Sequence, residues 1–517
     1  MLHDGRAIRV DVIGSSRIPF SRSHSKYRNH TNQDLMTAAH DGLINKLDLK
    51  GQTLGDVALG AVIKHSRDWN LARESVIESG LSIRTPAYDL QRACGTSIEA
   101  AIQIANKIAL GQIDSGIAGG TDTVSDAPIV YPDEYRRVLL DMHASRSMLG
   151  RLKHMFRIRP GHFKPELPGV TEPRTGLSMG ESMEITAKQW DVQREHQDQL
   201  ALASHMKAAA AYDEGFYEDL VVPYADLEED NNIRRDTTFE KLGTLKPVFD
   251  RSDEGTMTAG NSTPLTDGAA AVLLASEDWA RKKNLPVLAY LTFAKVAAVN
   301  FVNDEGLLMA PAYAVSDMLK QANLNLQDFD FYEIHEAFAA QTIATLKAWQ
   351  SEKFCRERLG RNEAMGPIDL SRLNVKGGSI AIGHPFAATG ARIVGTLAKI
   401  LSDNGSGRGL ISVCTAGGMG VTAILEATKD RLESLPRLGR HTAAFFFIAD
   451  KGLDVVENLV HVSLGKRDVF GQVRRGISQC AEQIDPVLAL LADAEQLVEL
   501  RARNAIAPRD QAQDAGK

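Results

Sequence analysis

The chain repeats a pattern in which a short apolar run is followed by a longer segment with apolar residues at helical spacing. The short runs, rich in Val, Ile and Ala, predict strands, and the longer segments predict helices that cover them. Strands and helices in alternation are typical of an α/β fold with parallel strand pairing. Predicted strands are 10–14, 57–62, 87–90, 115–119, 269–275, 288–298, 329–334 and 409–414, and predicted helices are 34–47, 97–110, 183–193, 194–215, 312–322, 337–350 and 388–403.

The alternation is interrupted, which suggests several closely associated parts in a chain of 517 residues. Residues 1–125 and 248–290 are predicted to form one α/β half and residues 291–428 a second. In both halves a reactive residue precedes a helix, then a strand, then a Gly-Gly pair. Residues 126–247 are interpreted as an inserted loop or cap domain. Residues 429–517 are interpreted as a helical extension, which either packs on its own body or docks another subunit.

Composition excludes several classes of protein. The formal net charge of −7 argues against a general nucleic-acid binder, although a local basic pocket for an anionic ligand remains compatible with it. No apolar run approaches the roughly 20 residues that a transmembrane helix needs, and the N-terminus lacks the apolar core of a signal peptide. The four cysteines form no CxxC pair and are too few for a disulfide scaffold, so a structural zinc site is not expected. Reduced thiols and a cytoplasmic location are predicted.

Two reactive residues each stand before a predicted helix. Cys94 in QRACGTSIEAA lies at a helix N-terminus, where the helix dipole favours a thiolate. Its alternative role is that of a buried structural cysteine. His384 in GGSIAIGHPFAATGAR is held on a turn between Gly383 and Pro385, and a histidine can take a proton from a thiol near neutral pH. The alternative for His384 is a capping or core histidine.

Two more reactive residues follow predicted strands. Cys414 in LISVCTAGGMG opens a glycine-rich turn whose backbone N–H groups can bind an oxyanion, unless it is a core cysteine at a strand end. His335 in FYEIHEAFAAQ lies between a strand and a helix, and the adjacent Glu336 either orients it or is structural. Because α/β folds build their sites at the C-terminal ends of strands, we expect all four residues to meet in one cavity.

At these residues the sequence resembles the thiolase family, over about residues 8–428. The resemblance implies a thiolase fold, in which two βαβαβαββ halves, each with a five-stranded sheet, pack as α/β/α/β/α layers around shared helices. The matching motifs are Cys94 with Gly95 and Ser97, HEAF at His335, GHP at His384, CTAGG at Cys414, MTAGNSTPLTDGAAAV at 257–272 and RIPF at 17–20.

The resemblance also implies a role for each residue. Cys94 is expected to be the nucleophile that becomes acylated, His384 the base that activates it, and Cys414 the second acid and base. His335 is expected to polarise the thioester oxygen in one oxyanion hole, and the backbone N–H groups of Cys94 and Ala416 to form the other. Residues expected to bind substrate are Met179, Thr263 and Phe338.

Two positions differ from many members of the family. Many thiolases carry Asn where this chain has His335, and the histidine form resembles the β subunit of the fatty-acid oxidation multienzyme complex. Many carry Gly at the position of Ala416, where a backbone N–H survives the change. Because thiolases are commonly dimers or dimers of dimers, the resemblance implies such an oligomer for this chain. The resemblance to the β subunit implies a hydratase/dehydrogenase α subunit as a further partner.

The implied reaction is the reversible conversion of 3-ketoacyl-CoA and CoA into acyl-CoA and acetyl-CoA, through an acyl-cysteine, in fatty-acid β-oxidation. CoA is a substrate, and neither a metal nor a redox cofactor is expected. One alternative is a biosynthetic acetyl-CoA C-acetyltransferase that makes acetoacetyl-CoA. A decarboxylating ketoacyl-carrier-protein synthase is disfavoured, because Cys414 has no role in that chemistry. A non-catalytic thiolase-like lipid-binding protein would be expected to have lost a nucleophile or base.

Overall fold

The computed structural model describes residues 7–167, 169, 171–303 and 305–428, and a mixed β-sheet forms its centre. The strand order is β4-β3-β5-β6-β1-β7-β10-β9-β8, and the short β2 pairs with β6 beside this path. The strands are β1 (Val10–Arg17), β2 (Ser21–Arg22), β3 (Asp56–Leu59), β4 (Ala87–Asp89), β5 (Ser115–Asp122), β6 (Thr266–Ser276), β7 (Ala289–Ala298), β8 (Phe331–Ile334), β9 (Gly407–Thr415) and β10 (Met419–Ala427).

The two α/β halves contribute unequally to this sheet. The first half supplies β4, β3, β5, β6 and β1, whereas the second supplies only β7, β10, β9 and β8 among the described residues. An isolated bridge between Tyr332 and Leu373 lies beside β8, where a fifth strand was expected. The halves are joined because β1 pairs with β7 at Asp11 and Val12. The expected layered α/β fold with two halves is therefore present, and the two residue pairs at Asp11 and Val12 join the two expected sheets into one path.

Parallel pairing holds for only part of the sheet. β3 pairs in parallel with β4 and β5, and β8 with β9, whereas the remaining pairs are antiparallel. One reason is the tight turn after β9, in which Gly417 and Gly418 adopt φ of 78° and 69° and lead directly into β10. The Gly119-Gly120 pair lies inside β5 instead of in a turn, so the predicted correspondence between the two Gly-Gly pairs is wrong.

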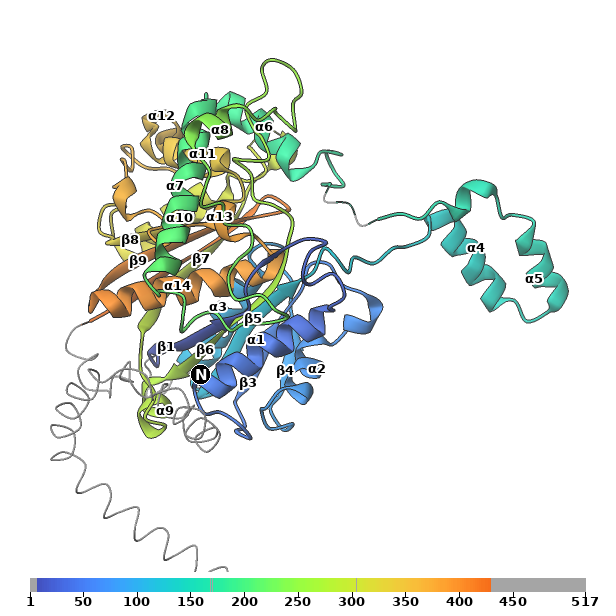
Figure 1. Cartoon of the computed structure of the whole chain (residues 1–517), viewed down its shortest axis with the longest axis horizontal. Helices are drawn as coiled ribbons and strands as arrows, with labels where there is room; N and C mark the ends of the chain where they lie inside the picture. Colours follow the sequence, from blue (N-terminus) through green and yellow to red (C-terminus); the bar gives the residue numbers. More distant parts are fainter. Residues whose placement is uncertain (1–6, 168, 170, 304, 429–517) are drawn as a thin grey trace, which may run out of the picture. The chain divides into compact units, whose positions relative to one another are not determined.

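Helices cover the sheet in layers (Figure 1). α3 and α14 pack against each other, α3 on strands of the first half and α14 on strands of both halves, so they form a central layer. α1 covers the opposite face of β6 and β1, and α10 packs on β7 and β10. The helices are α1 (Asn32–Lys46), α2 (Leu71–Glu78), α3 (Thr96–Ala109), α4 (Asp133–Ala144), α5 (Met148–Met155), α6 (Met179–Gln189), α7 (Arg194–Asp213), α8 (Phe239–Gly243), α9 (Glu277–Lys282), α10 (Ala310–Ala322), α11 (Ala339–Gln350), α12 (Glu352–Glu357), α13 (Ser379–Ile382) and α14 (Thr389–Asn404).

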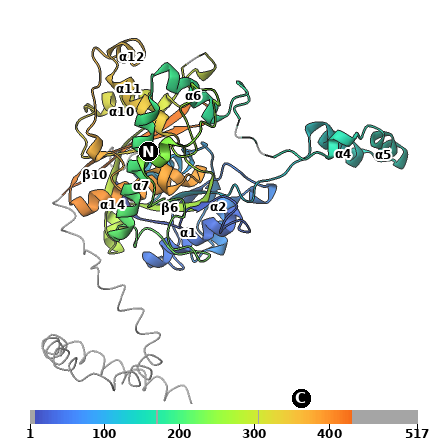
Figure 2. The same ribbon diagram turned by 45° about the horizontal axis from the view of Figure 1, so that its top comes forward.

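The apolar run of β6 explains why this strand lies inside the molecule. Ala270, Val272 and Leu274 belong to the core around α3 and α14, whereas Ala271 and Leu273 belong to the core around α1. Both faces of β6 are thus buried between helices, as Figure 2 shows for α14 and α1. A strand buried on both faces needs a continuous apolar sequence instead of an alternating one.

The described residues of the predicted insertion form five α-helices, and these differ in their packing. α6 and α7 pack against α11, and α7 also packs against α13. α4 and α5 pack against each other and carry large apolar side chains that are exposed, including Leu140, Met148, Leu149 and Phe156. No helix within the described ranges is long and apolar enough to cross a membrane. The predicted helical extension at 429–517 lies outside the described residues.

Candidate active site

Cys94 lies on a tight turn between β4 and α3. The residue before it, Ala93, has a φ of 43°, a left-handed conformation that is uncommon for a residue with a Cβ. The turn is held by the Thr96 hydroxyl, which donates to the Ala93 carbonyl at 2.7 Å and accepts from the backbone N–H of Arg92 at 2.9 Å. Strain of this kind is typical of functional sites, where the surrounding structure holds it in place. The turn presents the Cys94 thiol at the start of α3.

Three remote segments pack around this turn. A Cβ at Gly95 would lie 2.8 Å from the Thr415 side chain at the end of β9, so the turn sits directly on β9. The Ser97 hydroxyl accepts from the backbone N–H of Ala391 at 2.8 Å, which brings the first turn of α14 alongside α3. Asp122, at the end of β5, accepts from the N–H of Ala387 at 2.7 Å. These contacts bring the segment that carries His384 and the strand that carries Cys414 to the nucleophile turn.

The two thiols share one environment. Cys94 is partly exposed and Cys414 is buried. The pKa of the Cys414 thiol is raised well above its ordinary value, first by burial and then by the nearby charge of Cys94. The backbone N–H of Ala416 is near enough to the Cys94 thiol to lower its pKa, and its role as an oxyanion-hole donor remains a prediction. The thiols of Cys94 and Cys414, which are far apart in the sequence, therefore lie near each other.

The protonation of Cys94 differs from the sequence-based expectation. A helix N-terminus was expected to favour the thiolate, but burial raises the pKa of Cys94 to about 12, against the smaller lowering effect of the Ala416 N–H. The reason is that removing a thiolate from water costs more than the helix dipole and one hydrogen bond return. The resting residue is therefore a thiol, and a base would have to take its proton if Cys94 acted as a nucleophile.

Two imidazoles lie together on the segments that pack around the Cys94 turn and the strand of Cys414. The ring centroids of His335 and His384 are 4.2 Å apart, and both side chains are buried. Burial lowers the pKa of His384 to about 3, and burial together with the His384 charge holds the pKa of His335 well below its usual range. Both rings are therefore neutral near pH 7. The backbone N–H of His335 donates to the carbonyl of Ser412 at 2.8 Å. This bond holds the His335 backbone against β9, at a residue two positions before Cys414.

Each ring uses one nitrogen for the protein and leaves the other free. His335 Nδ1 lies 2.8 Å from the Ser379 hydroxyl, and His384 Nδ1 lies 2.5 Å from the Thr389 hydroxyl. Both Nε2 atoms are buried without a hydrogen-bond partner among the described residues. Buried unpartnered nitrogens are costly, so two of them side by side indicate a place where a ligand or a reacting group is bound.

Glu336 has a structural role, which the sequence had left open. Its carboxylate accepts from Ser204 at 2.7 Å, from Asn374 at 2.6 Å and from the backbone N–H of Ile380 at 3.3 Å. A Cβ at Gly378 would lie 2.1 Å from the carboxylate, so only glycine leaves room for it. Glu336 thus orders the segment that leads into α13, instead of contacting His335.

Sequence reasoning missed the hydroxyl and guanidinium groups behind the imidazoles. Arg392 on α14 donates to the Ser379 hydroxyl at 2.7 Å, and its other terminal nitrogen lies 3.7 Å from Glu333 on β8. Ser379, Thr389 and Arg392 stand in the same GGSIAIGHPFAATGAR run as His384, so the run itself was the available signal. Their contacts could not be found from it, because His335 comes from another strand.

The residues expected to bind substrate lie near this centre. Phe338 and Met179 belong to the same apolar cluster as Cys414. The Thr263 hydroxyl donates to the backbone carbonyl of Ser379 at 2.8 Å, and the Thr263 backbone N–H donates to Ala337 at 3.1 Å. These positions are compatible with a channel toward the thiols, and the substrate-binding role of the three residues remains a prediction.

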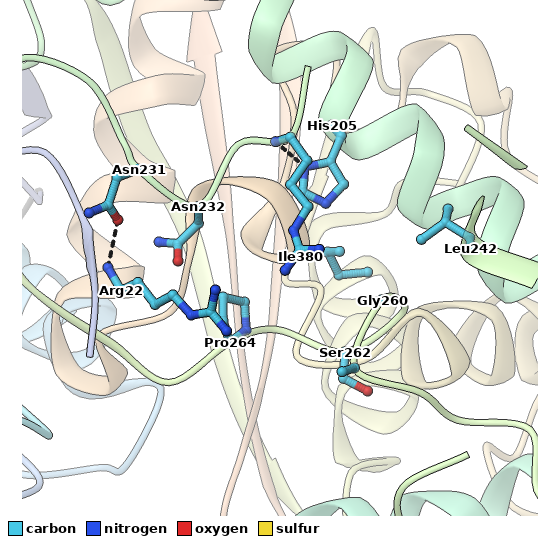
Figure 3. Close-up of a pocket in the computed structure, with 11 residues that line it drawn as sticks. Arg22, His205, Asn231, Asn232, Leu242, Gly260, Ser262, Pro264 and Ile380 are labelled. Atoms are coloured by element: carbon cyan, nitrogen blue, oxygen red, sulfur yellow. Dashed lines mark hydrogen bonds between the residues drawn. The ribbon is translucent and has the colours of Figure 1, made fainter. Parts of the chain in front are cut away.

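A pocket opens beside Thr263 and Ser379, and its lining includes their chain neighbours Ser262, Pro264 and Ile380. Figure 3 shows Arg22, Asn231 and Asn232 on one side of it and His205 and Leu242 on the other. Arg234 also lines it, and its backbone N–H donates to His205 Nδ1 at 3.2 Å. Two arginines in one pocket give the acidic chain a local cationic site. The remaining lining residues are Ala259 and Gly260.

The chain is similar to known proteins along almost its whole described length. Residues 10–278 match the family model described as "Thiolase, N-terminal domain", and residues 285–427 match "Thiolase, C-terminal domain". The 3-ketoacyl-CoA thiolase of Yersinia pestis (strain Pestoides F) is 41% identical over 424 residues, which cover 81% of this chain and 97% of that protein. The same figures hold for the 3-ketoacyl-CoA thiolase of Yersinia pseudotuberculosis serotype O:1b (strain IP 31758).

Solved structures give the same picture. The Bacillus anthracis acetyl-CoA acetyltransferase aligns with a TM-score of 0.68 and 29% identity, over 82% of this chain and 99% of that one. Human mitochondrial 3-ketoacyl-CoA thiolase in complex with CoA aligns with a TM-score of 0.68 and 28% identity, over 81% of this chain and 98% of that one.

Proposed function

The chain belongs to the thiolase family, and from this membership and the geometry of its site we propose that it transfers acyl groups to coenzyme A. The reaction converts 3-ketoacyl-CoA and CoA into acyl-CoA and acetyl-CoA, and it is reversible. The observation that carries the proposal is the convergence of two thiols, Cys94 and Cys414, beside two imidazoles with free Nε2 atoms. One thiol can carry the acyl group while the other handles the proton on carbon.

The first half-reaction breaks the carbon–carbon bond. Cys94 Sγ attacks the 3-keto carbon while its proton passes to His384 Nε2, and the N–H groups of Cys94 and Ala416 bind the resulting oxyanion. The bond between C2 and C3 then breaks, and its electron pair moves into the thioester as an enolate. His335 Nε2–H donates to the enolate oxygen, and Cys414 gives its proton to the enolate carbon. The products are acetyl-CoA and acyl-Cys94.

The second half-reaction transfers the acyl group. The Cys414 thiolate takes the proton of the CoA thiol, and the CoA sulfur attacks acyl-Cys94. Cys94 leaves as a thiolate and recovers its proton from His384, so both thiols return to their starting state. No metal or redox cofactor enters either half-reaction. Two half-reactions through one covalent intermediate predict ping-pong kinetics.

The cationic pocket supports CoA as the acyl acceptor. Arg22 and Arg234 line a pocket whose other walls include Ser262 and Ile380, each next in sequence to a residue near the imidazoles. We propose that the phosphate groups of CoA bind there, since guanidinium groups suit phosphates in charge and geometry. The pantetheine arm would then run past Thr263 toward the thiols.

We propose a degradative role in fatty-acid β-oxidation and a cytoplasmic location, and the HEAF motif and the named relatives support the degradative role. The alternative, a biosynthetic enzyme that makes acetoacetyl-CoA, is supported by the similarity to the acetyl-CoA acetyltransferase. We propose a homodimer or a dimer of dimers as the working form. The exposed apolar side chains of α4 and α5 support a further partner, such as a hydratase/dehydrogenase α subunit.

The proposal is tested by thiolysis assays over a range of acyl-CoA chain lengths, with mass spectrometry of the acylated peptide. Cys94→Ala is expected to abolish turnover while the fold survives, because the acyl carrier is lost. Cys414→Ser is expected to slow carbon–carbon cleavage much more than acylation of Cys94 by thioester exchange. Cys355→Ala is the matched control, because Cys355 lies buried in α12, donates only to the carbonyls of Ala348 and Trp349, and is expected to be dispensable.

Two outcomes would contradict the proposal. Retained thiolysis in Cys94→Ala would remove Cys94 as the acyl carrier. Absence of any acyl-enzyme in Cys414→Ser would contradict the division of roles between the two thiols. Preference for acetoacetyl-CoA alone over longer 3-ketoacyl-CoA substrates would favour the biosynthetic alternative.

A further inference from the structure

The proposed reaction asks opposite things of two similar imidazoles. His384 Nε2 must accept a proton from Cys94, so it must be bare, whereas His335 Nε2 must carry a hydrogen to bind the enolate oxygen. Both rings are buried and neutral near pH 7, so each has one N–H only. The ring centroids are 4.2 Å apart, so the two rings share the same buried environment, and burial alone does not make one a donor and the other a base. The partner of each Nδ1 must decide which tautomer forms.

The partner of His335 is a hydroxyl whose acceptor side is already used. The Ser379 hydroxyl accepts from Arg392 Nη2 at 2.7 Å, and a guanidinium can only donate. The hydroxyl hydrogen then has one partner among the described residues, His335 Nδ1 at 2.8 Å. If Nδ1 carried the hydrogen instead, the hydroxyl would accept twice and its own hydrogen would be buried without an acceptor, which is costly. The hydrogen of His335 is thus directed to Nε2.

The partner of His384 is arranged in the opposite sense. The Thr389 hydroxyl lies 2.5 Å from His384 Nδ1, and its other neighbour is the carbonyl oxygen of Pro385 at 3.4 Å. A carbonyl can only accept, so this hydroxyl can donate to Pro385 and turn a lone pair toward Nδ1. In that arrangement the hydrogen of His384 lies on Nδ1, and Nε2 is left bare.

Arg392 is a costly group to keep in this position. Its side chain is 1% exposed, and its Nε and Nη1 atoms have no hydrogen-bond partner among the described residues. Its hydrogen bond within the described part of the chain goes to Ser379, and the carboxyl of Glu333, two residues before His335, lies 3.7 Å from Nη1. Burial raises the pKa of Glu333 to about 8, so this carboxyl compensates the guanidinium charge only in part, and the contact is weak evidence for stability. Its single directed hydrogen bond points to a role in the site.

We propose that Ser379 and Arg392 are positioning residues that hold His335 as the Nε2–H tautomer, while Thr389 holds His384 as the opposite tautomer. This inference rests on the proposed function, because it assigns the means by which one imidazole becomes a donor and the other a base. Neither Ser379 nor Arg392 contacts the reacting atoms in this scheme. They act through the ring of His335.

Ser379→Ala tests the proposal, because it removes the hydroxyl without adding bulk. Two rates are measured by mass spectrometry of acyl-Cys94 after rapid quenching. Acylation by acetyl-CoA is a thioester exchange that forms no enolate, and it is expected to stay within about threefold of the wild-type rate. Acylation by a 3-ketoacyl-CoA requires the enolate, and it is expected to fall about 10–100-fold, somewhat less than the loss of a whole oxyanion-hole donor.

Two further variants separate positioning from general damage. Ser379→Thr keeps a hydroxyl and is expected to recover most of the carbon–carbon cleavage rate. Ser16→Ala removes a buried hydroxyl on β1 that has no hydrogen-bond partner among the described residues, and it is expected to change neither rate. Equal slowing of both acylation rates in Ser379→Ala, or no slowing of either, would overturn the proposal.

The tautomers themselves can be read independently of activity. Nitrogen-15 NMR of the histidine rings distinguishes a protonated from a bare nitrogen, and His335→Asn identifies the signals of His335 by difference. The wild-type enzyme is expected to show a protonated Nε2 at His335, and Ser379→Ala a mixture or the reverse. A protonated Nδ1 at His335 in the wild-type enzyme would overturn the inference. Wild-type enzyme that forms no acyl-Cys94 with either substrate would instead refute the proposed function.

Discussion

At the scale of single residues, a buried histidine outside the thiol site makes the stability of the fold depend on pH. His40 on α1 is fully buried, and burial lowers its pKa to about 4. In the unfolded chain its pKa would be near the ordinary value of about 6.5. As pH falls through that value, the unfolded chain takes up a proton that the folded protein does not. His40 therefore contributes stability above about pH 6.5 and loses it as pH falls toward 4.

We predict that His40→Gln weakens the acid sensitivity of the fold. Between about pH 7.5 and about pH 5, the wild-type protein should lose about 2 kcal/mol of its free energy of unfolding through His40, and the variant should be spared this loss. Urea unfolding at the two pH values measures the difference. His196→Gln, at an exposed position on α7, is the control and should behave as the wild type does.

Comparing the variants with the wild type cancels opposing groups that are common to all three proteins. Burial raises the pKa values of Asp11 and Asp122 to about 7. Through these two carboxyls the free energy of unfolding therefore decreases as pH rises, opposite to the effect of His40. Equal pH dependence in His40→Gln and the wild type would show that His40 is not a neutral buried group.

At the scale of elements, the contact between α14 and α3 sets the site. The backbone of Gly390, in the first turn of α14, approaches α3 so closely that a Cβ there would lie 2.3 Å from the backbone nitrogen of Ile98. The neighbouring Ala391 donates to Ser97, three residues after Cys94. A shift of α14 would thus separate His384 from the nucleophile turn.

We predict that Gly390→Ala destabilises the protein by about 1–3 kcal/mol, because a backbone atom cannot yield to the added methyl group. Ala otherwise favours a helix over Gly by about 0.5–1 kcal/mol. The control is Gly243→Ala in α8, where a Cβ would meet nothing within 4 Å, and it should be neutral or slightly stabilising. Thermal unfolding of the two variants measures both effects. A stabilised Gly390→Ala protein would show that the helices can move apart at no cost.

At the scale of the whole molecule, both family-model matches lie between residues 10 and 427. The family-model matches end at residue 427, where β10 ends between β7 and β9. The groups of the proposed site lie between Cys94 and Ala416. Residues 429–517 carry no chemical motif.

We therefore predict that a variant ending at Thr428 folds and is acylated at Cys94 at a rate within about threefold of the full chain, because the groups of the proposed site and the family-model matches lie before that residue. Circular dichroism and the acylation assay measure this, with the full chain as the control. An insoluble or unreactive variant would show that residues 429–517 are part of the body.

Much of the fold was predictable because the relevant signals are local. The predicted strands and helices correspond to elements of the structure, with ends that differ by a few residues, since periodicity reports which faces are buried. β10 was missed because its beginning depends on the turn at Gly417 and Gly418. The continuity of the sheet was missed because only two residue pairs, at Asp11 and Val12, join β1 to β7. Pairing of that kind leaves no local signal.

The sequence by itself determined which residues could react, namely two cysteines and two histidines. It also determined the family, because the family's motifs occur in the right order. Only the tertiary structure decided their states. The pKa of Cys94 is raised where the helix terminus alone predicted a lowering, because desolvation depends on neighbours such as Thr415 that are remote in the chain. The tautomer proposed for His335 likewise depends on the Ser379 hydroxyl and the Arg392 guanidinium, which come from other elements. Charge, protonation and hydrogen bonding are set by distance in space, which sequence spacing does not give.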